Sequence, residues 1–292
     1  MERFDILGLT TLLQRTTGRP DIVVGLIDGP VALDHPDLAG QRIREIGGFV
    51  PAECADRGSA ACAHGTFVAG ILAAKRRSVA PAMCPDCTLL VRPIFSETTS
   101  LPGFGPTATA EQLSAAIVDS VRAGARVLNL SVNLTGFSSA DEGRLADALN
   151  FAASRGAIPV VAAANQGNSD ASTLTRHPWV LPVMAIDRVG RPLPSSTLSA
   201  AVRKHGVAVP GDGVVSLGTD GRSLMLSGTS AATALVTGTI ALLWSELPKA
   251  RAADVRFAIS NSAPKRRGGL VPPMLNAWST YQTLAGMLHV QN

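Results

Sequence analysis

Three residues that could together form a nucleophilic active site stand far apart in this chain: Asp28, His64 and Ser230. A serine hydroxyl is a weak nucleophile until a positioned imidazole removes its proton. A carboxylate can in turn fix the tautomer of that imidazole and stabilise its charged form. If the fold brings the three side chains together, the chemistry they predict is acyl transfer through a serine.

The surroundings of each residue suggest where it stands in the fold. Asp28 ends the apolar run 22–27, His64 opens HGTFVAG, and Ser230 opens a long apolar stretch. We expect Asp28 at the carboxyl end of a strand, where parallel sheets form their crevice. We expect His64 and Ser230 in the first turns of helices, where free N–H groups face outward. Taken singly, the residues could be a turn residue, a helix-start polar residue and an N-cap; their joint context favours a site.

Apolar strand-like runs alternate with helical patterns over most of the chain, which predicts an α/β fold with a doubly wound, mainly parallel sheet and helices on both faces. The expected strands are 22–27, 88–95, 126–132, 158–164, 180–186 and 207–209. The expected helices are 66–75, 110–123, 140–155, one starting at Ser230, 252–260 and 275–288.

The predicted helix 110–123 shows this logic most clearly. Leu113, Ile117 and Val121 fall on one face at four-residue steps. Thr109 and Gln112 can form a capping box at its start, and Gly124 suits its end.

Composition restricts the classes of protein. With 292 residues, 46% of them hydrophobic and 16% charged, the chain can bury a large core. The basic clusters 76–77 and 265–267 lack interleaved aromatic residues, so we expect no nucleic-acid partner. The uncharged stretch 223–245 is rich in Gly, Ser and Thr, which favours a buried helix over a membrane span. We expect one domain over residues 1–292, with 1–20 as an N-terminal extension and 264–292 as a C-terminal loop and helix.

The N-terminal residues carry Glu2 and Asp5 and lack both a basic start and a continuous apolar stretch. They do not read as a secretory signal, so we expect a cytoplasmic protein with no membrane association. The sequence leaves the oligomeric state open.

Four ordered motifs resemble the subtilisin family of serine peptidases: IDGP at 27–30, DHPDL at 34–38, HGTFVAG at 64–70 and GTSAA at 228–232. The resemblance covers about 21–262 and keeps the family's order of Asp, His and Ser. It implies that Ser230 attacks the scissile carbonyl, His64 transfers the proton and Asp28 orients His64. It also implies that Asn165 and the backbone N–H of Ser230 bind the oxyanion.

The resemblance further implies where a peptide substrate binds. The segment Ser131, Val132 and Asn133 would pair with an extended peptide as an added strand. The family usually has a small residue where Asn133 falls. Leu101 and Phe104, in the loop 96–107, could contact the substrate or pack in the core.

Within the family, GLIDGP at 25–30 and LLVRPIF at 89–95 look most like the proteases that mature cyanobactins from ribosomal precursor peptides. The spacing from Asp28 to His64 leaves little room for the helical lid of macrocyclising members, so hydrolysis is expected. Basic residues 75–77 disfavour a calcium site, and we expect no resident cofactor. The resulting hypothesis is a serine endopeptidase that processes the leader of a precursor peptide. The alternative is a catalytically silent peptide-binding or scaffold protein.

The four cysteines allow three interpretations. Cys54, Cys62, Cys84 and Cys87 could bind zinc through four thiolates, although their spacing is not that of a common zinc finger. They could form two local disulfides, 54 to 62 and 84 to 87, or remain free thiols. Disulfides would be unusual in the cytoplasm.

Overall fold

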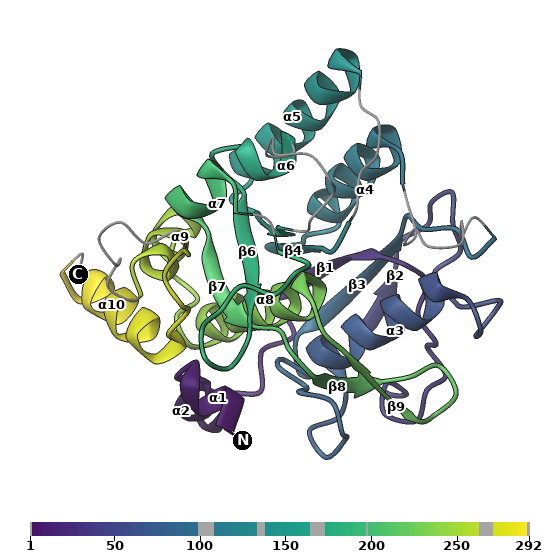
Figure 1. Cartoon of the computed structure of the whole chain (residues 1–292), viewed down its shortest axis with the longest axis horizontal. Helices are drawn as coiled ribbons and strands as arrows, with labels where there is room; N and C mark the ends of the chain where they lie inside the picture. Colours follow the sequence, from purple (N-terminus) through teal and green to yellow (C-terminus); the bar gives the residue numbers. More distant parts are fainter. Residues whose placement is uncertain are drawn as a thin grey trace.

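The strands of the central sheet are nearly continuous apolar runs, as expected for a parallel sheet covered on both faces. The computed structural model describes residues 2–98, 108–132, 138–163, 173–196, 198–262 and 271–290. Within them, the strands of this sheet are β1 (Val23–Asp28), β2 (Ile43–Glu45), β3 (Thr88–Pro93), β4 (Val127–Leu130), β5 (Ile158–Ala162), β6 (Leu181–Ile186) and β7 (Val207–Pro210). The predicted fold class is confirmed (Figure 1).

The strand order of the sheet is β2-β3-β1-β4-β5-β6-β7, and every neighbouring pair is parallel. The chain first adds strands on one side of β1 and then returns to add β4 on the other side. Such a reversal of strand order opens a crevice beyond the carboxyl ends of the strands on either side of it. Those ends are Asp28 of β1 and Leu130 of β4, which are neighbours in the sheet.

Helices cover both faces of the sheet (Figure 1). The helices α3 (Ala60–Ala73) and α8 (Thr229–Glu246) share one core with Val24 and Leu26 of β1. The helices α4 (Ala110–Arg122) and α5 (Ser139–Ser154) share the opposite core with Ile27. Successive residues of a strand point to opposite faces, so one strand anchors both layers.

The predicted caps of α4 are present. Thr109 and Gln112 form a capping box, and Gly124 ends the helix with φ 98. From Thr229 onward the uncharged stretch forms the expected core helix, α8, in which Thr233, Thr239 and Ser245 each donate a hydrogen bond to the carbonyl four residues earlier. In the described part of the chain, none of the helices has the length and apolarity needed to cross a bilayer.

Several elements differ from the prediction. The N-terminal extension forms α1 (Glu2–Ile6) and α2 (Leu9–Arg15), and Leu9 and Leu12 are fully buried in the core that contains Leu284 of α10 (Ala277–Val290). The strand β2 and the hairpin of β8 (Val214–Leu217) and β9 (Ser223–Leu226) were not predicted. The remaining helices are α6 (Thr173–Arg176), α7 (Ala200–His205) and α9 (Ala252–Ser260).

Candidate active site

A short hydrogen bond joins two of the three predicted residues. Asp28 is the last residue of β1 and has no exposed surface. Its Oδ1 atom lies 2.6 Å from Nδ1 of His64 and also accepts a hydrogen bond of 2.7 Å from the backbone N–H of Gly29. A neutral imidazole that donates from Nδ1 leaves Nε2 free to accept a proton. The carboxylate therefore holds His64 in the tautomer that a general base needs.

The environment of His64 favours its charged form. Burial lowers the pKa of the imidazole, but the negative charge of Asp28 and its hydrogen bond raise it, and the net pKa lies above 6.5. The side chain of His64 keeps 22% of its surface exposed, whereas that of Asp28 is completely covered. The imidazole can thus exchange protons at the surface while its partner stays out of water.

Two glycines allow α3 to approach β1 closely enough for this contact. A Cβ atom on Gly29 would lie 2.0 Å from the carbonyl oxygen of Ala61, and one on Gly65 would lie 2.3 Å from that of Pro30. Neither distance is compatible with a side chain. Both glycines lie in the motifs that suggested the site, but the sequence pattern did not show that they face each other.

The helix that carries His64 begins earlier than predicted. Ser59 caps α3 by accepting a hydrogen bond from the N–H of Cys62, so the helix starts at Ala60 instead of Thr66. His64 consequently stands in the second turn, and the expectation that it lies in the first turn is wrong. Thr66, two residues further along α3, accepts from the N–H of Ala32 and ties the helix to the segment after β1.

Ser230 stands where the prediction placed it, in the first turn of α8. The N–H of Gly228 donates to the carbonyl of Gly211, and the N–H of Gly211 donates to that of Ile186, the last residue of β6. The start of α8 is therefore fixed at the carboxyl edge of the sheet, the same edge at which β1 ends with Asp28. The helices α3 and α8 pack against each other, so His64 and Ser230 come from neighbouring elements.

The predicted substrate segment begins at this edge too. Leu130 pairs with Ile27, and Ser131 and Val132 follow directly after β4, both largely buried. Asn129 donates from Nδ2 to the hydroxyl of Ser131 and accepts a hydrogen bond from Thr237 of α8 through Oδ1. Sequence reasoning missed Asn129, although a polar residue inside an apolar strand was a visible signal. It connects the helix of Ser230 to the segment predicted to bind substrate.

Four predicted site residues lie outside the described part of the chain: Asn165, Asn133, Leu101 and Phe104. Their roles in oxyanion and substrate binding stay predictions.

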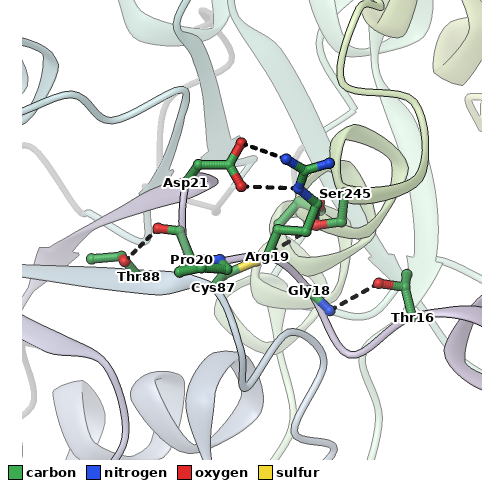
Figure 2. A network of polar contacts seen from close by, with 9 residues as sticks. Thr16, Gly18, Arg19, Pro20, Asp21, Cys87, Thr88 and Ser245 are labelled. Carbon is green, nitrogen blue, oxygen red and sulfur yellow. Dashed lines mark hydrogen bonds and ion pairs between the residues drawn. The ribbon is translucent and has the colours of Figure 1, made fainter.

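The cysteines divide into two separate pairs, which corrects the interpretation as a single zinc site. Cys54 and Cys62 form a disulfide just before His64. Cys84 and Cys87 are buried free thiols, and Cys87 contacts Ser245 of α8 (Figure 2). A hydrogen bond with Cys87, together with burial, raises the pKa of Cys84. Of the two disulfides in the disulfide interpretation, only the one between Cys54 and Cys62 is formed. Disulfides are typical of oxidising compartments, so this bond does not support the expected cytoplasmic location, which stays a prediction.

Comparison with known proteins places this geometry in a family. Residues 19–279 match the subtilase family. Fervidolysin from Fervidobacterium pennivorans is 28% identical over 89% of this chain, and thermitase from Thermoactinomyces vulgaris is 29% identical over 84% of this chain and 82% of its own length. The chain spans 40% of the length of fervidolysin and 59% of that of a thermophilic serine proteinase from a Bacillus species.

Solved structures agree with this result. The protease domain of PatA superposes with a TM-score of 0.83 at 32% identity, covering 92% of this chain and 97% of that domain. The prenylagaramide maturation protease PagA superposes with a TM-score of 0.81 at 27% identity, covering 95% and 98%. The chain belongs to the subtilase family.

Proposed function

We propose that this protein is a serine endopeptidase in which Ser230 forms an acyl-enzyme with the substrate. His64 takes the proton of the Ser230 hydroxyl as the oxygen attacks the scissile carbonyl, and then delivers that proton to the leaving amine. Water next attacks the acyl-enzyme, with His64 again acting as the base. Asp28 stabilises the imidazolium that forms in both steps.

The observation that carries this proposal is the 2.6 Å contact between His64 and a fully buried Asp28. A buried carboxylate is costly unless it is paired, and here its partner is a histidine at the edge of the sheet. Ser230 stands at the same edge in the first turn of α8, where its backbone N–H is not needed by the helix. That N–H is available to an oxyanion, and we propose that the side chain of Asn165 supplies the second donor.

The substrate we propose is an extended peptide. The segment after β4 continues a parallel strand beyond its last pairing partner, and such an edge can accept one more strand. Ser131, Val132 and Asn133 would bind the backbone of the substrate, and Leu101 and Phe104 its apolar side chains.

The printed names of similar structures suggest the source of this peptide. PatA is described as a patellamide maturation protease and PagA as a prenylagaramide maturation protease. We propose that the present chain likewise processes a ribosomally made precursor peptide by removing its leader. Hydrolysis is favoured over ring closure, because residues 29–59, between β1 and α3, form the short strand β2 and no helix that could exclude water.

Two experiments separate this proposal from the alternative of a silent scaffold. A fluorophosphonate probe should label the wild-type protein but not the Ser230→Ala variant, and Ser227→Ala, which changes an exposed serine nearby, should label normally. A digest of a peptide library read by mass spectrometry should then give linear products that carry one added water. Failure of the wild-type protein to react with the probe would favour the scaffold. Cyclic products would contradict the preference for hydrolysis.

A further inference from the structure

A cavity of about 400 Å³ lies at the edge of the sheet opposite to the candidate active site. Its walls come from the end of α4, the turn into β4 and the end of α5, and they include Arg122, Arg126, Arg155 and Phe151. Arg126 precedes β4 and Ser131 follows it, so the cavity is roughly 16 Å from the substrate segment at about 3.3 Å per residue. It is a separate place on the molecule.

The three guanidinium groups are held by aromatic rings. Those of Arg122 and Arg155 lie 5.8 and 5.3 Å from the centre of the Phe151 ring. That of Arg126 lies 4.2 Å from the centre of the Trp244 ring. The guanidinium groups of Arg122 and Arg155 can therefore be no farther apart than the sum of their two distances to the centre of the Phe151 ring. This upper limit is close to the Debye screening length, roughly 10 Å at 0.1 M ionic strength.

Capping of the helix ends does not explain these arginines. The carbonyls in the last turn of α4 accept from the backbone N–H groups of Ala123, Gly124 and Ala125. Those of α5 accept from Arg155, Gly156 and Ala157 in the same way. A further cation, Arg44, already donates to the carbonyl of Ala123 beside the cavity. The helix ends therefore have their hydrogen bonds without Arg122, Arg126 or Arg155 side chains.

Close ion pairs do not explain these arginines either. Within the described part of the chain, no carboxylate lies within ion-pair distance of Arg122, Arg126 or Arg155. Asp21 is the acidic residue that acts on Arg126, but both its oxygens accept from Arg19 at 2.9 and 3.2 Å (Figure 2). Asp119, one turn before Arg122, pairs with Arg92. Like charges thus surround the cavity without an ion pair within the described residues, and Asp21 acts on Arg126 only from beyond ion-pair distance.

We propose that this cavity is a binding site for oxyanions, with Arg122, Arg126 and Arg155 as the recognising groups. A guanidinium presents paired N–H donors that match the two oxygens of a carboxylate or a phosphate. The aromatic rings fix the guanidinium planes, which reduces the entropy lost when a ligand binds. A volume of about 400 Å³ is within the range of small-ligand sites.

The oxyanion could come from two sources, a free small anion or the acidic side chains of a peptide. Calorimetric titration of the Ser230→Ala variant, which cannot consume a peptide, with inorganic phosphate, citrate and a tetraglutamate peptide distinguishes them. We expect saturable binding that weakens as salt is added. Tighter binding of the peptide than of citrate would identify an exosite for acidic segments, and the reverse would identify a small-anion site.

Substitutions locate the site. Arg122→Gln and Arg155→Gln, each added to Ser230→Ala, change exposed residues, so the fold should persist, and each should weaken binding roughly tenfold because a hydrogen bond to a charged group is lost. The control is Arg203→Gln in the same background. It removes an exposed charge from α7, a helix that packs against β6, and should leave binding unchanged. The proposal is overturned if none of the three anions binds at millimolar concentration, or if the two cavity variants bind like the control. Neither outcome depends on peptidase activity.

Discussion

His64 and Asp28 approach each other to 2.6 Å, and only the histidine of the two reaches the surface. The contact couples the protonation of the imidazole to a carboxylate that solvent cannot screen. Because Asp28 raises the pKa of His64 above 6.5, the neutral imidazole that can accept a proton becomes dominant only above that pH. Two measurements follow from this single contact.

The first is the pH dependence of activity. We expect kcat/KM to rise with pH through a pKa above 6.5, as His64 loses its proton. Asp28→Asn removes the charge that raises the pKa, so the burial effect that lowers it should move this limb to lower pH. It should also reduce kcat by about 10⁴-fold, because the tautomer is no longer held. Asp254→Asn, which changes a partly buried carboxylate on α9 paired with the exposed Arg251, is the control and should leave the limb in place. An unchanged limb in Asp28→Asn would contradict the assigned pairing.

The second is the pH dependence of stability. A pKa that is raised in the folded state means that the pairing stabilises the fold fully below the unfolded pKa, near 6.5, and that this contribution is lost as pH rises through the folded pKa. We expect the free energy of unfolding of Ser230→Ala, measured with urea, to contain a component that declines above pH 6.5. The same series in Ser230→Ala with Asp28→Asn should lack that component. An equal pH dependence in both proteins would show that another group causes it.

The close packing around Gly29 and Gly65 predicts that activity falls when α3 is pushed away from β1. Gly65→Ala would place a methyl group 2.3 Å from the carbonyl of Pro30, so α3 must move away from β1. We expect a loss of about 1–3 kcal/mol in the free energy of unfolding and a larger proportional loss of kcat than of substrate affinity. Gly143→Ala is the matched control, because its methyl group meets no atom and it lies in a helix. It should stabilise the protein by about 0.5–1 kcal/mol without changing kcat.

Much of this arrangement could be predicted from the sequence. Apolar runs of Val, Ile and Leu indicated the strands, and Thr109, Gln112 and Gly124 marked both ends of α4. Asp28 at a strand end and Ser230 at a helix start followed from the same patterns. These features are local, because propensity and capping depend on residues only a few positions apart.

Other features depend on contacts between remote segments. The start of α3 is an exception, because it was placed too late although its cap, in which Ser59 accepts from the N–H of Cys62, is local. The pairing of Gly29 with Ala61 and of Gly65 with Pro30 cannot be read from either motif alone. The contact of Cys87 with Ser245 of α8 likewise joins segments that are far apart in the sequence. Such contacts form only when the fold brings the segments together, so neither segment predicts them by itself.

The buried hydrogen bonds of Asn129 predict coupling between α8 and the substrate segment. Thr237→Val removes the donor to Asn129 Oδ1 and leaves that oxygen buried without its partner, at a cost of about 1–3 kcal/mol. Since Asn129 also donates to Ser131, we expect KM for a peptide substrate to rise while probe labelling of Ser230 persists. Thr239→Val is the control on the same helix, because Thr239 donates within α8, to the carbonyl of Leu235. Equal KM values for the two variants would mean that Asn129 has a structural role alone.

The disulfide between Cys54 and Cys62 predicts that the redox state affects α3, the helix that carries His64. It closes a short loop immediately before His64, and within that loop Ser59 caps α3 and Arg57 binds the carbonyl of Thr219. The double variant Cys54→Ser, Cys62→Ser should lose about 2 kcal/mol of stability, since the loop is short, and should show lower kcat because the start of α3 is less fixed. A reductant should shift the melting temperature of the wild-type protein toward that of the double variant and leave the double variant unchanged. If reductant lowers the two melting temperatures equally, the effect comes from elsewhere in the chain. If the wild-type protein does not respond while a thiol count shows that the disulfide is reduced, the bond does not hold α3 in place.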